Sequence, residues 1–142
     1  MTAFHDISSA LDEHLLEMQD VPQALAMPNS EFVPTKGTLF LRPTVLPGDV
    51  ERATTGTVAH DEYTGIYQID VIAPAGEGKY ESMMMADKIA DHFKRGTEFT
   101  YKGGRANRLV RCLKASYLPM AADGAWVIVP VQISYYSLTA ER

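Results

Sequence analysis

Cysteine is nearly absent from this chain of 142 residues, which has Cys112 alone. One thiol cannot form an intramolecular disulfide, and the sequence offers no cysteine-based zinc site. Because Cys112 stands among apolar residues in 109–113, we interpret it as a small buried side chain on a strand. A catalytic thiol would need a nearby base and an electropositive setting, and the sequence supplies neither.

Long hydrophobic runs are also missing, since no segment approaches the roughly 20 apolar residues that span a bilayer. The first residues, Met1–Asp6, lack the basic and apolar regions of a signal peptide. We therefore expect a protein that is made and kept in a reducing cytoplasm and binds no membrane.

Motifs for catalysis and for cofactors are incomplete or absent. Residues 73–80 resemble a phosphate-binding loop, but Ala73 stands where that loop needs glycine and Tyr80 where it needs serine or threonine. No two histidines have the spacing of a local zinc pair, and His60–Glu62 is interpreted as a solvated polar cluster. Without a nucleophile elbow or a distinctive carboxylate pair, the sequence predicts no enzyme, no cofactor and no metal site.

Lysine and arginine are absent from the first 35 residues, whose six acidic side chains give a net charge of −6. Residues 94–114 carry seven basic side chains against Glu98 alone, a net charge of +6, although the whole chain is at −5. The blocks could neutralise each other within one subunit, or pair head to tail between subunits and close a ring. Scattered solvated charge and a DNA-contacting strip are the other interpretations, but the acidic total argues against generic DNA or membrane binding.

Hydrophobic periodicity predicts two helices, over 4–18 and 79–94. In the first, Asp6 falls away from the apolar face, whose members are Phe4, Ile7, Leu11, Leu15 and Met18. In the second, Met84 falls opposite the stripe and Gly96 is placed as the C-terminal cap. The main stripe of that second helix comprises Met83, Ala86, Ala90 and Phe93.

Strand signals complete a single predicted domain, 1–142, with an irregular proline-rich arm over 21–37 and a long loop or hairpin tip over 48–62. Pro43 restricts the first strand to a sheet edge or a bulge. Tight turns imply antiparallel pairing, so we expect an α+β fold: a mostly antiparallel sheet of about five strands with both helices on one face. The predicted strands are 38–46, 63–73, 98–102, 105–118 and 125–136.

Several segments resemble the tail terminator-like proteins of long-tailed, lambda-type bacteriophages, and together they span roughly residues 35–136. They are Leu39–Thr44 with Leu46 and Pro47, Gly65–Gly78, Ala86–Phe93, Arg95–Thr97 and Trp126–Tyr135. The resemblance implies a non-enzymatic structural protein of the virion with an α+β fold. It also implies a hexameric ring at the head-proximal end of the tail, assembled in the host cytoplasm, which stops growth of the tail tube and offers the surface that joins the head.

The implied partners are other copies of the chain, the major tail tube protein and a head-completion or neck protein, while DNA passes through the ring without specific binding. The alternatives are a head–tail joining or neck completion protein, a minor tail protein of similar size, or a small hydrolase or nucleotide-binding enzyme whose activity Lys79→Ala would abolish. We expect the arm 21–37 and the loop 48–62 to reach the other partners. The expected interface residues are Asp12, Glu13, Glu17, Arg52, Met84, Lys102, Arg105 and Arg108.

If the charged blocks pair between subunits, ring assembly should weaken as salt rises, because exposed charges are screened over about 8 Å at physiological ionic strength. The double change Arg105→Glu and Arg108→Glu should weaken assembly and leave the monomer folded. Arg111 is expected to be a poorer probe, since its neighbours Val110 and Cys112 place it near the core. Sedimentation and circular dichroism test this, and assembly indifferent to both salt and charge reversal would remove the electrostatic explanation.

Overall fold

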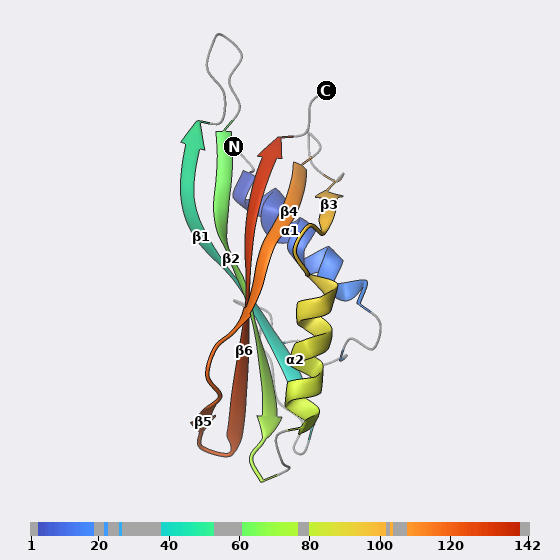
Figure 1. Cartoon of the computed structure of the whole chain (residues 1–142), viewed down its shortest axis with the longest axis vertical. Helices are drawn as coiled ribbons and strands as arrows, with labels where there is room; N and C mark the ends of the chain where they lie inside the picture. Colours follow the sequence, from blue (N-terminus) through green and yellow to red (C-terminus); the bar gives the residue numbers. More distant parts are fainter. Residues whose placement is uncertain are drawn as a thin grey trace.

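The computed structural model of the chain contains two helices and six strands among its described residues (Figure 1). The described residues are 3–18, 22, 26, 38–52, 61–76, 80–101, 103 and 108–139, without the side chains of 3, 49–52, 61 and 139. The elements are α1 (Ala3–Leu16), β1 (Phe40–Arg52), β2 (Asp61–Pro74), α2 (Tyr80–His92), β3 (Glu98–Tyr101), β4 (Arg108–Tyr117), β5 (Ala121–Asp123) and β6 (Trp126–Thr139).

One curled antiparallel sheet has the strand order β1-β2-β6-β4-β3, and β5 pairs with β6 beyond the end of β4. The α+β prediction is confirmed, including both helices on one face, because the buried residues of α1, α2 and the sheet form one cluster. The short strand β5 was not predicted. It forms a tight hairpin with β6 around Gly124, whose positive φ of 61° suits glycine.

The core follows the alternation of the two long central strands. Ile69 and Val71 of β2 lie opposite Val131 and Val129 of β6, and all four side chains are buried on the helix side. Each such side chain contributes about 1.5–3 kcal/mol of hydrophobic stabilisation. The helices add the buried side chains of Ile7, Leu11, Leu15, Ala86 and Ile89. Cys112 is buried as expected, and burial raises the pKa of its thiol to about 12.

Two details of α1 differ from expectation. Asp6 is buried, with its carboxylate 3.1 Å from Nδ1 of His5, so it does not lie on a solvated side. Phe4 is 55% exposed because it lies in the first turn of the helix, next to Pro47 and Gly48 of β1. The core stripe of α1 therefore begins at Ile7, one turn later than the periodicity predicts.

The hairpin β1–β2 takes up much of the predicted loop. β1 continues to Arg52 and β2 starts at Asp61, so 48–52 and 61–62 belong to the two strands of a hairpin, while 53–60 lie outside the described residues. β1 is an edge strand, as Pro43 required, and its register shifts between Pro47 and Val50. Most of the arm 21–37 also lies outside the described residues, although the Ala26 N–H donates to the Leu41 carbonyl of β1 at 2.8 Å.

The end and the buried face of α2 are corrected by the structure. The helix ends at His92, and Gly96 is not its cap but the third residue of a turn closed from Thr97 N–H to Lys94 O at 3.0 Å. Its φ of 89° is the one that a type II turn requires at that position. Ser82 rather than Met83 faces the core, because the buried stripe runs through Ser82, Ala86 and Ile89.

Pro130 marks the place where β6 changes partners. On one side it lies opposite Asp70 of β2, and on the other its carbonyl accepts a hydrogen bond from Leu118 N–H at 3.1 Å. In an antiparallel pair the Leu118 carbonyl would in turn accept a hydrogen bond from the N–H of residue 130, but proline has no N–H. The ladder of β4 ends one residue earlier, at Tyr117, and the ladder of β5 begins at Ile128 of β6.

The C-terminal ends of the two helices are joined by a reciprocal histidine contact. His14 Nε2 lies 3.1 Å from the His92 carbonyl, and His92 Nε2 lies 2.6 Å from the His14 carbonyl, so each ring donates from Nε2. The two rings stack at 4.1 Å, and His14 also stacks on Phe99 at 4.3 Å. Nδ1 of His14 is buried and has no hydrogen-bond partner within the described ranges, although a Glu17 carboxylate oxygen lies 3.5 Å away. Burial is the main cause of a lowered His14 pKa, and the hydrogen bond to the His92 carbonyl partly offsets it.

The lowered pKa of His14 makes the free energy of unfolding depend on pH. A folded-state pKa below the ordinary value of 6.5 means that the unfolded chain binds the proton first. The stabilisation is therefore complete above pH 6.5 and is lost as the pH falls from there through the lower folded-state pKa. His14→Gln should cost about 1 kcal/mol at pH 7.5 and reduce the loss of stability on acidification to pH 5, as measured by urea unfolding. Parallel curves for wild type and variant would contradict this.

Candidate functional site

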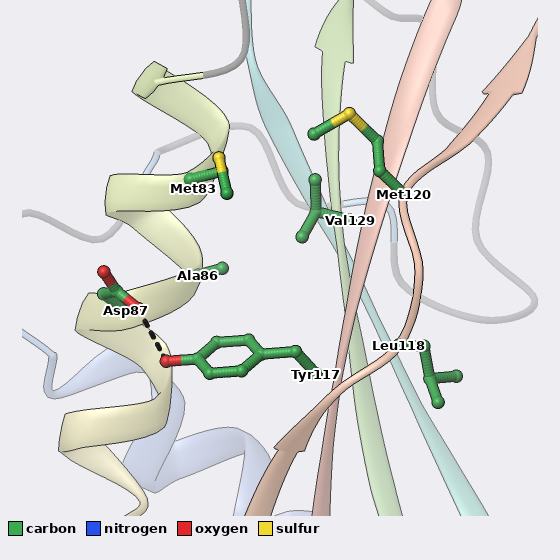
Figure 2. A pocket seen from close by; sticks show the side chains of 7 residues that line it. All are labelled: Met83, Ala86, Asp87, Tyr117, Leu118, Met120 and Val129. Atoms are coloured by element: carbon green, nitrogen blue, oxygen red, sulfur yellow. Dashed lines mark hydrogen bonds between the residues drawn. The ribbon is translucent and has the colours of Figure 1, made fainter.

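An apolar groove lies between α2 and the region where β4 passes into β5 (Figure 2). Its volume is about 180 Å³. Helix α2 forms one wall and the chain from Tyr117 to Met120 forms the other, with Val129 of β6 between them. The lining residues are Met83, Ala86, Asp87, Tyr117, Leu118, Met120 and Val129.

A hydrogen bond crosses this groove. The Tyr117 hydroxyl donates to Asp87 Oδ1 at 2.6 Å and so links the end of β4 to α2. This bond is the main cause of a raised Tyr117 pKa, because the carboxylate holds the phenolic proton. Both side chains are exposed, so the bond positions the groove walls and leaves the acidic charge at the rim.

Most side chains around the groove are apolar, and several of them are open to solvent. Met83 is 44% exposed, and Tyr117, Leu118 and Met120 are exposed as well. Flexible, polarizable methionine side chains adapt to varied apolar partners, and clustered exposed apolar residues mark interaction sites. No group of three or more metal-ligating side chains occurs in the described parts of the chain. The groove is therefore suited to binding an apolar side chain.

The sheet face away from the helices carries a row of hydrogen-bonded polar side chains across three strands. Gln132 of β6 donates to Gln68 at 2.8 Å, and Gln68 donates to Asp70 at 2.9 Å. Arg42 of β1 donates twice to the other oxygen of Asp70, at 2.8 and 3.2 Å. Because Ile69 and Val71 face the core, this row lies on the opposite face and offers no side chain that is free for chemistry.

Comparison with known families identifies the chain. A family model described as phage tail terminator protein matches residues 6–135, which span most of α1, all of α2 and β1 to β5, and β6 as far as Tyr135. The chain belongs to this family. Its members are structural proteins of the phage tail, so this chain is a component of the virion. The expected resemblance and the structural role are confirmed.

Solved structures agree on the fold. One chain, whose name states no function, has a TM-score of 0.74 at 20% identity, with 100% of this chain and 99% of that chain covered. A second, from the virion of a native gene transfer agent particle, has a TM-score of 0.60 at 17% identity, covering 97% of this chain and 98% of that one. A search of curated proteins finds no match.

The interface residues expected from the sequence differ in burial where the structure describes them. Asp12 of α1 is partly buried and accepts a hydrogen bond from Tyr67 at 2.6 Å, and burial raises its pKa against the effect of that bond. Glu13, Glu17 and Met84 are exposed. Lys102, Arg105 and the side chain of Arg52 lie outside the described residues. The assembly role of these residues stays a prediction.

The positions of Arg108 and Arg111 are the reverse of what was expected. Arg108 is only 8% exposed and lies over the Tyr63 ring at 5.1 Å, with Nη1 buried and no hydrogen-bond partner among the described residues. Arg111 is exposed and pairs with Glu98 at 3.4 Å. The reason is strand alternation: Arg108, Val110 and Cys112 share the buried face, so Arg111 between the last two must point away.

Charge reversal at these two arginines should therefore have unequal effects. Arg108→Glu places an unpaired acid in a buried position and should cost about 3 kcal/mol of unfolding free energy. Arg111→Glu loses one exposed ion pair and should cost less than about 1 kcal/mol. Urea unfolding of the two variants measures the difference. Equal losses would show that Arg108 is not held in the buried face.

Proposed function

We propose that this tail protein closes the end of the phage tail tube as a ring, stops the growth of the tube and offers the surface to which the head joins. The observation that carries the proposal is the match of the tail terminator family over residues 6–135. The exposed apolar groove supports it, because a ring subunit needs a binding surface beyond its own core. The proposed partners are other copies of the chain, the tail tube protein and a head-completion or neck protein. DNA passes through the ring without specific binding.

Termination of this kind is a competition for one end of a polymer. The subunit must bind the tube end better than another tube subunit does, and must not offer a surface on which the tube can continue. An advantage of about 1.4 kcal/mol per contact gives a tenfold preference, and several contacts around a ring multiply it. No bond is made or broken, so binding surfaces alone can perform the work.

The decisive experiment is deletion of the gene, followed by electron microscopy of the tails. Loss of a terminator should give headless tails that are overlong or variable in length, because nothing stops addition of tube subunits. A plasmid copy of the wild-type gene is the control and should restore both normal length and heads.

The same experiment distinguishes tail termination from the alternative function, head–tail joining. Headless tails of normal length would show that length is set without this protein, and would assign it to head–tail joining instead. Normal tails with normal heads would overturn both functions.

A further inference from the structure

β4 carries an unusual exposed residue at its bulge. Cys112 pairs with Tyr135 and Lys114 pairs with Ser134, so Leu113 is the extra residue between two consecutive positions of β6. A β-bulge re-aims the side chain at the extra position. Leu113 is 42% exposed, although Cys112 beside it is fully buried. The bulge thus presents an apolar side chain on an otherwise regular ladder.

Two cations flank this leucine. Arg111 and Lys114 are exposed, and they lie opposite Tyr136 and Ser134 of β6. Because Tyr135 faces the core, its two neighbours and their β4 partners belong to the sheet face away from the helices. The Arg111–Glu98 contact is exposed and 3.4 Å long, which makes it weak. We call Leu113, Arg111 and Lys114 together the Leu113 knob.

The groove beside α2 has the opposite charge. Met83, Asp87 and Asp91 follow one another at intervals of four residues, so the two carboxylates continue the side of α2 that lines the groove. Across the groove, exposed Asp123 ends β5 three residues after Met120. The other charged residues of α2, Glu81 and Lys88, have opposite signs. The described rim of the groove is therefore acidic.

We propose that the groove receives the Leu113 knob of a second copy of this chain. The proposal rests on the proposed function, in which copies of the chain assemble with one another. An apolar cavity of about 150 Å³ can hold benzene, so a groove of about 180 Å³ has room for a leucine side chain. Arg111 and Lys114 of the incoming copy then lie near Asp87, Asp91 and Asp123.

The geometry of this contact leads to a closed or continuing assembly. The groove lies on the helix side of the sheet and the knob on the opposite face, so each chain carries both halves of the contact. Such a contact is heterologous: it generates a ring where the rotation closes and a filament where it does not. The basic residues of this contact belong to the basic block 94–114 of the sequence. Their acidic partners lie at the rim of the groove and not in the acidic block 1–35.

Cysteine cross-linking tests the contact directly. Tagged Leu113→Cys chains are mixed with untagged Met83→Cys chains and oxidised, both as concentrated purified protein and in particles complemented with the two genes. We expect a disulfide-linked pair of one tagged and one untagged chain. Met84→Cys is the matched control, since Met84 is 61% exposed on the same helix but does not line the groove. The native Cys112 is buried and does not compete.

The outcomes are decisive in either direction. Selective linkage of Leu113→Cys to Met83→Cys, in solution or only in particles, supports the proposal. Equal linkage to Met84→Cys, linkage of Met83→Cys chains to each other alone, or no linkage in either preparation overturns it. Lys114→Glu should lower the yield of the selective link about tenfold, by turning attraction into repulsion, while Lys94→Glu outside the knob should not.

Failure of this contact and failure of the proposed function give different results. Overlong tails on gene deletion, without the selective link, would leave the terminator function standing and place the subunit contact elsewhere. The selective link, with tails of normal length after deletion, would establish the contact in a protein that does not set tail length.

Discussion

The uninterrupted pairing of β2 with β6 is the constraint on which the rest of the molecule depends. From Tyr63 opposite Ser137 to Pro74 opposite Trp126, the register runs without a shift. Every residue on these strands is thereby assigned to one face, with the core on the helix side and polar residues such as Gln68 and Gln132 on the other. The irregularities, at Pro47 and at Leu113, fall in the flanking strands β1 and β4. A regular centre allows the flanking strands to bulge and present side chains without moving the core.

Much of this fold could be predicted because local patterns and tertiary packing agree. Residues 63–73 have strand-forming side chains on both faces and form β2, and Pro43 correctly indicated an edge strand. The predictions of which residues are buried were wrong where burial depends on elements distant in the sequence. Met83 lies beside the buried stripe of α2, but the sheet meets the helix through Ser82 instead. Arg111 was placed near the core on the character of its neighbours, although in a strand neighbours point to opposite faces.

The candidate site was less accessible to sequence reasoning. Its walls come from α2, from Tyr117 at the end of β4 and from residues that follow Tyr117, all at least 30 positions after the α2 residues that line the groove, and no local motif joins them. Met84 was identified as an exposed residue of α2, yet the groove is lined by the residue before it, Met83. One feature of the sequence could have indicated the groove. Apolar residues surround a proline at the end of a predicted strand: Tyr117, Leu118 and Met120. Function came instead from resemblance over most of the chain, since binding surfaces leave no short signature.

The proline at position 130 has a consequence for how this surface can vary. Because β6 offers no N–H there, β4 cannot continue along it, and the chain departs over Leu118 and Met120 before β5 resumes the pairing. The hollow beside α2 is thus created by the main chain and not by any one side chain. Substitution of the exposed residues that line it changes the groove's shape and charge without changing the course of the main chain. A lineage could in this way change what fits into the groove while the groove itself stays in place.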